Sequence, residues 1–189
     1  SHHSGAGGTS CRVLHSILVK HVKGTVVYDI DNLGYLGLLI DAVRVSLNVL
    51  VVFGSETLCR PWCIAAIVCA YRKGTPLHSV IFLNPKSEDT VCSAVSTDTY
   101  VKTFTGKLAD KSRAVTFEVD TFSLRGYGLS QEGVHPAIQA MTAVEPVFMS
   151  FLEVGKLNND MEEMFGRMAN ITCAGSVADA TAKFFTSSK

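Results

Sequence analysis

The sequence predicts one α/β domain built on a parallel, doubly wound sheet. Stretches whose apolar residues repeat at helical spacing alternate with short strand-like stretches, which is typical of parallel β-α-β units. Residues 49–53 are apolar throughout, as expected for a strand that is covered on both faces. The 189 residues, of which 47% are hydrophobic, suffice for one sizeable core and fall short of two full domains.

The amino-terminal half of the chain is predicted to hold three helices and three strands. Thr9 or Ser10 caps the first helix, which ends at Gly24. Pro61 suits the first turn of the third helix, which runs to the residue before Gly74. The apolar positions that mark the first two helices are Val13, Leu14, Ile17, Leu18, Leu36, Leu39, Ile40 and Val43. The predicted strands are residues 25–28, 49–53 and 78–83.

The carboxyl-terminal part of the chain carries weaker signals. We expect a strand over residues 114–119, a helical stretch after Pro136 that Pro146 interrupts, and a helix over residues 160–168. Residues 86–110 are polar and rich in threonine and serine, and they predict no more than one short helix.

A strand is missing before the first predicted helix. A doubly wound sheet has its first strand directly before a glycine-rich turn, whereas this chain starts at the turn. Two hypotheses follow: the strand is absent from this sequence, or residues 182–186 of the tail occupy its position. The predicted organisation is therefore a domain over residues 1–170 and a tail over residues 171–189, which supplies the strand under the second hypothesis.

Charge and composition argue against several kinds of partner. The 17 basic and 17 acidic residues cancel and no run of like charge occurs, so we expect no nucleic-acid partner. Apolar stretches are much shorter than the roughly 20 residues that cross a bilayer. Residues 1–10 are polar and glycine-rich, unlike a signal peptide. The expectation is a cytoplasmic protein without a membrane partner.

The six cysteines predict reduced thiols rather than a metal site. No Cys-x-x-Cys pair occurs, and a zinc site from Cys59, Cys63 and Cys69 would lack paired ligands at finger-like spacing. Cys63 and Cys69 lie in an apolar helical stretch, where a free cysteine behaves as a small hydrophobic residue. We therefore expect no bound metal.

The most informative motif is Arg60-Pro61-Trp62-Cys63, which follows the apolar residues 49–53 and a short turn. Two further motifs precede it in the chain, Ser1-His2-His3 at the first turn and Tyr28-Asp29 at the end of the strand predicted over residues 25–28. With these three motifs in this order, the chain resembles a Toll/interleukin receptor (TIR) domain of the kind found in algae and other protists. The resemblance covers roughly residues 1–120.

The resemblance implies a fold and two alternative functions. The fold would be a flavodoxin-like, mainly parallel sheet of five strands with extra carboxyl-terminal helices, here a TIR-like domain over residues 1–170. Some TIR domains are nucleosidases that cleave the nicotinamide–ribose bond of NAD in immune or defence signalling, with NAD as substrate and no metal. Others are non-enzymatic scaffolds that associate with themselves or with other TIR domains.

The family's catalytic glutamate lies four residues after the tryptophan, and that position is Ala66 in this sequence. A spacing of four places Trp62 and residue 66 on one helix face, so an indole and a carboxylate there would meet the same ligand. A methyl group cannot stabilise the positive charge that develops on the ribose. Ala66 therefore indicates a natural inactive relative or an engineered Glu→Ala change. The uncharged, apolar helix start favours the engineered change.

Several residues are candidate ligand contacts through this resemblance, and each has a plainer interpretation. The two histidines would otherwise be a solvated pair at the terminus, Asp29 and Ser55 simple turn residues, and Trp62 a core aromatic. A third function would be another flavodoxin-like nucleotide or nucleoside binder, such as a deoxyribosyltransferase-like enzyme. The candidate contacts are His2, His3, Tyr28, Asp29, Ser55 and Trp62.

Overall fold

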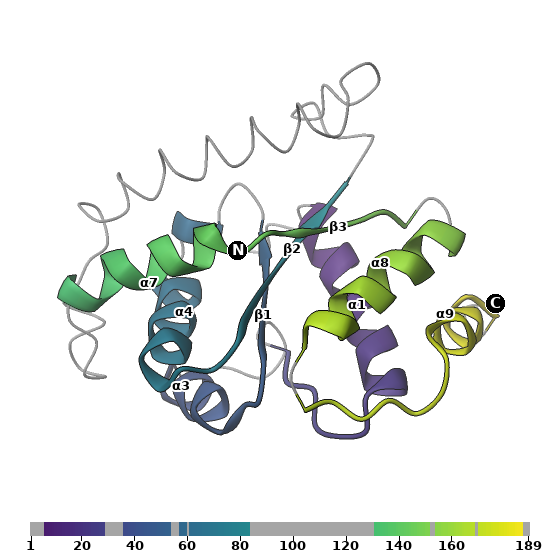
Figure 1. The fold of residues 1–189 in the computed structure, drawn as a ribbon, viewed down its shortest axis with the longest axis horizontal. Coiled ribbons are helices and arrows are strands. Elements are labelled where there is room, and N and C mark those ends of the chain that lie inside the picture. Colours follow the sequence, from purple (N-terminus) through teal and green to yellow (C-terminus); the bar gives the residue numbers. More distant parts are fainter. Residues whose placement is uncertain are drawn as a thin grey trace, which may run out of the picture.

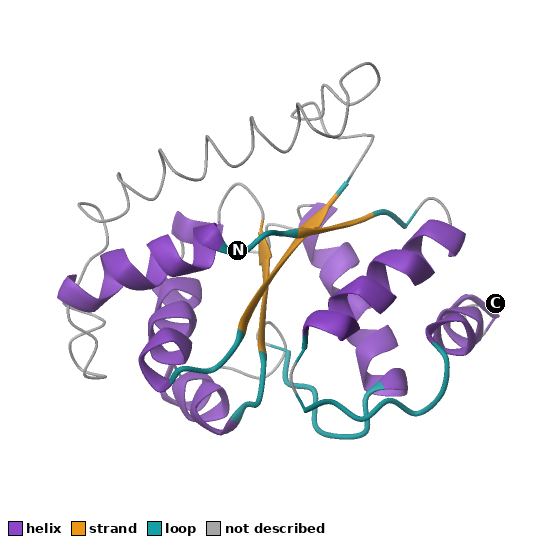
Figure 2. Ribbon diagram, in the orientation of Figure 1, coloured by secondary structure: helices purple, strands orange, loops and turns teal. Residues whose placement is uncertain are grey.

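The computed structural model has three layers, with a parallel sheet between two layers of helices (Figures 1 and 2). It describes residues 6–28, 36–53, 57–59, 61–83, 131–151, 154–168 and 170–186. These segments contain six α-helices and three strands. The predicted parallel α/β class is therefore confirmed, whereas a sheet of five strands stays a prediction.

The sheet consists of β1 (Val49–Phe53), β2 (Leu77–Phe82) and β3 (Val147–Met149) in that spatial order. Both strand pairs are parallel, with Val49 opposite Leu77 and Val80 opposite Val147. The carboxyl ends of the three strands consequently meet at one edge of the sheet. We call this the carboxyl edge and the opposite one the amino edge.

Helices α3 (Leu36–Val45), α4 (Pro61–Lys73) and α7 (Gln131–Ala143) lie together on one side of the sheet (Figure 1). They enclose what we call the first core, to which the strands contribute Val51, Phe53 and Ile81. The other side carries α1 (Ala6–His21), α8 (Val154–Arg167) and α9 (Val177–Thr186). Their second core takes Val80, Val147 and Met149 from the strands. Both faces of the sheet are thus covered, which explains strands without polar alternation.

Helix α4 is the most deeply buried helix segment on the first-core side. It packs on α3, on α7 and on strands β1 and β2. Contact on three sides leaves five of its side chains with 0% exposure, namely Ile64, Ala65, Ile67, Val68 and Ala70. The apolar sequence of α4 is therefore a consequence of its packing.

A backbone motif ends α4 at the predicted residue. The N–H of Gly74 donates to the carbonyl of Tyr71 (3.0 Å), and the N–H of Thr75 donates to the carbonyl of Ala70 (2.9 Å). This pair of bonds is the Schellman arrangement, which needs a left-handed residue after the helix. Gly74 supplies it with a φ of 73°.

The tail does not supply a strand, so the hypothesis for residues 182–186 is wrong. These residues are the end of helix α9. The Ser176 hydroxyl accepts a hydrogen bond from the N–H of Asp179 (3.1 Å) and caps the helix. Val177 and Thr181, one turn apart, are buried, and α9 packs against α1 and α8. The burial of these two residues on one face of the helix determines the structure of the tail.

Four other elements differ from the prediction. Residues 25–28 form no strand; Val26 packs on the second core, and the Tyr28 ring stacks on His15 of α1. Helix α1 starts at Ala6, ahead of the predicted caps, and α7 includes Pro136 in its interior. Strand β3 was not predicted. The predicted strand over residues 114–119 lies outside the described residues.

We expect Gly74→Ala to lower the free energy of unfolding by about 1 kcal/mol, because a side chain is strained at positive φ. No atom lies within 4 Å of an added Cβ, so the effect comes from the backbone alone. Urea denaturation measures it. Gly166→Ala is the matched control, since that glycine also has open space but lies in helix α8. Alanine should stabilise it by up to about 1 kcal/mol. Equal changes in the free energy of unfolding for the two substitutions would contradict the role of Gly74 as the left-handed residue that ends α4.

Candidate functional site

Trp62 lies at the carboxyl edge of the sheet, in the first turn of α4. Strand β1 is followed by a short 3-10 helix, Thr57–Cys59, and by Pro61 at the helix start. The Thr57 hydroxyl donates to the carbonyl of Val52 (3.1 Å), which ties this turn to the strand. In doubly wound sheets, ligands bind outside the carboxyl ends of the strands. The local structure thus places the only tryptophan in the chain at the expected ligand-binding edge.

The indole of Trp62 is half-buried and packs against the first core. It is therefore anchored on one side and retains exposed surface. A rigid, partly exposed aromatic ring of this kind can stack on the ring of a ligand. Trp62 thus packs as a core aromatic on one side, and its role as a ligand contact stays a prediction.

Ala66 is half-buried one turn after Trp62 and packs against the same core. The first turn of α4 has no acidic residue. Position 66 therefore offers no group that could exchange a proton or stabilise a cation. The apolar character of α4 follows from burial between the sheet, α3 and α7. It no longer favours an engineered Glu→Ala change over a natural alanine.

The structure does not bring the two described candidate contacts together. Tyr28 stacks on His15, with ring centroids 5.1 Å apart, beside helix α1 on the second-core side. Trp62 belongs to the first-core side. The other candidate contacts, His2, His3, Asp29 and Ser55, lie outside the described residues, so their roles stay predictions.

Sequence reasoning missed a group of side chains at the ends of β2 and β3. Phe82 closes β2 and Phe151 follows β3, and their rings are tilted by 34° with centroids 5.1 Å apart. Between β3 and Phe151, the N–H of Ser150 donates to Asp160 Oδ2 on α8 (3.3 Å). Recognising Val147–Met149 as a strand after Pro146 would have placed Phe151 at the carboxyl edge.

Asp160 is a half-buried carboxyl group with an altered acidity. Burial raises the pKa of Asp160, and the negative charge of Glu163 acts in the same direction. The Ser150 N–H and the positive charge of Lys156 oppose this rise in pKa. A carboxylate that has lost part of its hydration interacts favourably with a nearby cation. Asp160 is therefore a candidate binding group of the carboxyl edge.

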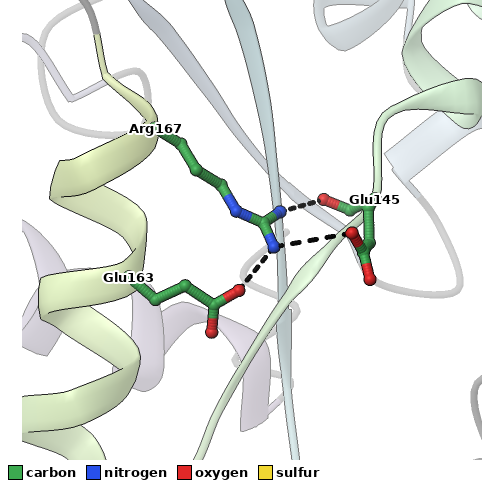
Figure 3. A network of polar contacts seen from close by, with 3 residues as sticks. All are labelled: Glu145, Glu163 and Arg167. Atoms are coloured by element: carbon green, nitrogen blue, oxygen red, sulfur yellow. Dashed lines mark hydrogen bonds and ion pairs between the residues drawn. The ribbon is translucent and has the colours of Figure 1, made fainter.

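An ion-pair network, drawn in Figure 3, lies at the amino edge. Arg167, at the end of α8, donates to the carbonyl of Glu145 (2.5 Å) and pairs with the carboxylate of Glu163. Its guanidinium also lies 3.8 Å from the Glu145 carboxylate. These contacts join α8 to the segment that leads into β3, and their role is structural.

Two buried histidines also lie away from the carboxyl edge. His78, at the start of β2, has Nε2 hydrogen-bonded to Asn48 Oδ1 (3.0 Å). Burial lowers the pKa of His78, and the positive charge of Arg167 lowers it further. His21 packs on Phe165 with ring centroids 4.5 Å apart, and burial lowers its pKa as well. The lowered pKa values favour the neutral form of both imidazoles.

Within the described segments, no three His, Cys, Asp or Glu side chains are grouped so as to hold a metal ion. In the same segments, no helix combines the length and apolar character that crossing a bilayer requires. Cys69 and Cys173 are free thiols.

Comparison of the chain with protein-family models and with curated proteins finds no match. The resemblance to TIR domains therefore rests on the three sequence motifs and stays a prediction.

The protein should lose stability as the pH falls below about 6.5, the ordinary pKa of histidine. His21 and His78 have lower pKa values in the folded chain, so the unfolded chain binds protons first and acid favours unfolding. This stability is present above pH 6.5 and disappears as the pH falls through the folded-state pKa values. Urea midpoints measured between pH 8 and pH 5 test it.

His78→Gln keeps a polar side chain that does not titrate, and it should reduce the loss of stability in acid. If the urea midpoint of His78→Gln depended on pH as strongly as that of the parent chain, the lowered pKa of His78 would not be the cause of the loss of stability in acid.

Proposed function

We propose that this chain is a TIR-type domain that binds NAD at the carboxyl edge of its sheet, within an NAD-consuming signalling or defence system. The observation that carries the proposal is the position of Trp62, half-buried in the first turn of the helix that follows β1. Ligands of doubly wound folds bind at this edge. The order of the sequence motifs gives the ligand class.

The chain as it stands is proposed to bind NAD without cleaving it by the family's route. Breaking the nicotinamide–ribose bond develops positive charge on the ribose, as in glycoside hydrolysis. A carboxylate fixed beside the ribose stabilises that charge. Ala66 has only a methyl group, and α4 carries no acid in its first turn. The activity of the family would therefore require a glutamate at position 66.

A non-enzymatic scaffold is the second candidate function, and exposed apolar side chains on α3 favour it. Leu38 and Val45 are separated by seven residues and share a helix face, with exposures of 56% and 81%. Leu47, which follows this helix, is 63% exposed. Neighbouring exposed apolar groups are typical of a surface that binds another protein. Self-association or binding to other TIR domains would use such a surface.

Trp62→Ala should weaken NAD binding at least about fivefold, because stacking of a base on an aromatic side chain contributes about 1–3 kcal/mol. Isothermal titration calorimetry with NAD measures the affinity. Tyr71→Ala is the matched control, since Tyr71 is an exposed aromatic at the far end of the same helix. The proposal would be overturned if the parent chain did not bind NAD. It would also be overturned if Trp62→Ala and Tyr71→Ala lost the same amount of NAD affinity.

Ala66→Glu should release nicotinamide from NAD, because it restores the carboxylate one turn after Trp62. Chromatography of the reaction mixture measures the nicotinamide, and circular dichroism checks that the variant folds, since residue 66 is half-buried. Ala66→Gln has the same size without the charge and should stay inactive. A folded Ala66→Glu chain that binds NAD and releases no nicotinamide would favour the scaffold function.

A further inference from the structure

The outer face of α3 is an apolar surface whose direction is fixed by the first core. Leu39, Ile40 and Val43 are buried in that core and hold the helix in one rotation about its axis. The opposite face of α3 carries Leu38 and Val45, with exposures of 56% and 81%. A surface that is already ordered loses little conformational entropy when a partner binds.

The chain that follows α3 is anchored as well. The N–H of Ser46 donates to the carbonyl of Ala42 (3.1 Å), and the Ser46 hydroxyl donates to the same carbonyl (2.7 Å). Lys73 Nζ, at the end of α4, donates to the carbonyl of Ser46 (3.0 Å). These bonds fix the residue directly before Leu47, which is 63% exposed. Leu47 therefore extends the apolar surface beyond the end of the helix.

An exposed ion pair lies on the same surface. Asp41 is three residues after Leu38 and four before Val45, so the three side chains share one helix face. Arg44 Nη1 lies 3.2 Å from Asp41 Oδ1, and both side chains are more than half exposed. The acidic and the basic group cancel in charge. We call this surface the α3 patch, and it consists of Leu38, Asp41, Arg44, Val45 and Leu47.

The order of these residues makes the α3 patch complementary to itself. A two-fold axis across the patch sets the α3 helices of two copies antiparallel and reverses the order of their residues. With the axis midway between residues 42 and 43, Asp41 of each copy lies opposite Arg44 of the other. The same axis sets Leu38 opposite Leu47, because each lies three residues outside the ion pair. One arrangement thus pairs opposite charges and also pairs apolar groups.

We propose that the α3 patch binds a second copy of this chain, in a two-fold contact between antiparallel α3 helices. The inference rests on the scaffold function proposed above, to which it adds the partner and the register. A second copy suits the patch better than a strongly acidic or basic partner, because the charges of the patch cancel. The 17 basic and 17 acidic residues of the whole chain cancel too, so two copies do not repel each other at long range.

A contact through this helix alone makes a weak dimer. The ten residues of α3 span about 15 Å. The α3 patch is consequently much smaller than a standard interface, which buries about 800 Å² on each partner. We expect a dimer whose population rises with protein concentration. Sedimentation equilibrium of the parent chain, from micromolar to near-millimolar concentration, measures its dissociation constant.

The apolar part of the contact is tested with Leu38→Gln. This variant should raise the dissociation constant at least about tenfold, because each dimer loses the burial of two leucine side chains. Val19→Gln is the matched control, since Val19 is a 51% exposed valine on helix α1, on the other side of the sheet. The control should dimerise like the parent chain.

The charged part of the contact is tested by reversing each charge. Asp41→Arg leaves two basic groups on the α3 patch, and Arg44→Asp leaves two acidic groups. Each variant alone should dimerise at least about tenfold more weakly, because like charges then face each other. An equimolar mixture of the two variants should form a heterodimer, which sedimentation velocity with a fluorescent label on one variant detects. The double variant Asp41→Arg/Arg44→Asp exchanges the charges and should dimerise like the parent chain.

The possible results separate this inference from the NAD-binding function, which calorimetry measures on the same preparations. A monomeric parent chain that binds NAD overturns the α3 dimer alone. A dimeric parent chain that binds no NAD overturns the NAD-binding function and leaves the dimer standing. A dimer that Leu38→Gln leaves intact, or a mixture of charge variants without heterodimers, overturns the contact through α3. Weak association of each charge variant alone, restored in the mixture and in the double variant, supports it.

Discussion

Burial of helix α4 on three sides is the constraint on which the candidate site depends. The sheet, α3 and α7 surround the helix, and five consecutive or near-consecutive side chains have no exposure. Close packing of this kind tolerates neither added volume nor an unpaired charge. It fixes the rotation of the helix about its axis and therefore the direction of its first turn. Trp62 keeps its exposed surface at the carboxyl edge because the residues after it are immobilised.

The elements that were predicted well from the sequence are those whose ends are determined by a particular residue type. Helix α4 begins at Pro61 and ends at Gly74, because proline fits a first helical turn and glycine adopts the left-handed cap. Strand β3 has only three residues, which is too short for a reliable periodic pattern. The tail was misjudged because its helical stripe has a threonine, Thr181, at a buried position. Asn158 receives the hydroxyl hydrogen bond of that threonine (2.5 Å), a tertiary contact that no local pattern contains.

The candidate site was predictable on one side of the sheet and not on the other. Trp62 follows a strand and opens a helix within a few residues, so its position can be inferred from local sequence. Phe82 and Phe151 meet only because β2 and β3 are neighbours in the sheet. The hydrogen bond from Ser150 to Asp160 depends on how α8 folds back along β3. Both contacts require the tertiary structure, since neither residue type nor spacing indicates them.

The division of the interior into two cores has a consequence for how the protein tolerates sequence change. Alternate residues of each strand enter different cores, as Val80 and Ile81 do, and no helix of the described segments contributes to both. Energetic effects of substitutions add when the sites share no partners. Repacking beneath α3, α4 and α7 should therefore combine independently with repacking beneath α1, α8 and α9. The two halves of the interior can diversify separately, with the strand backbone as their common framework.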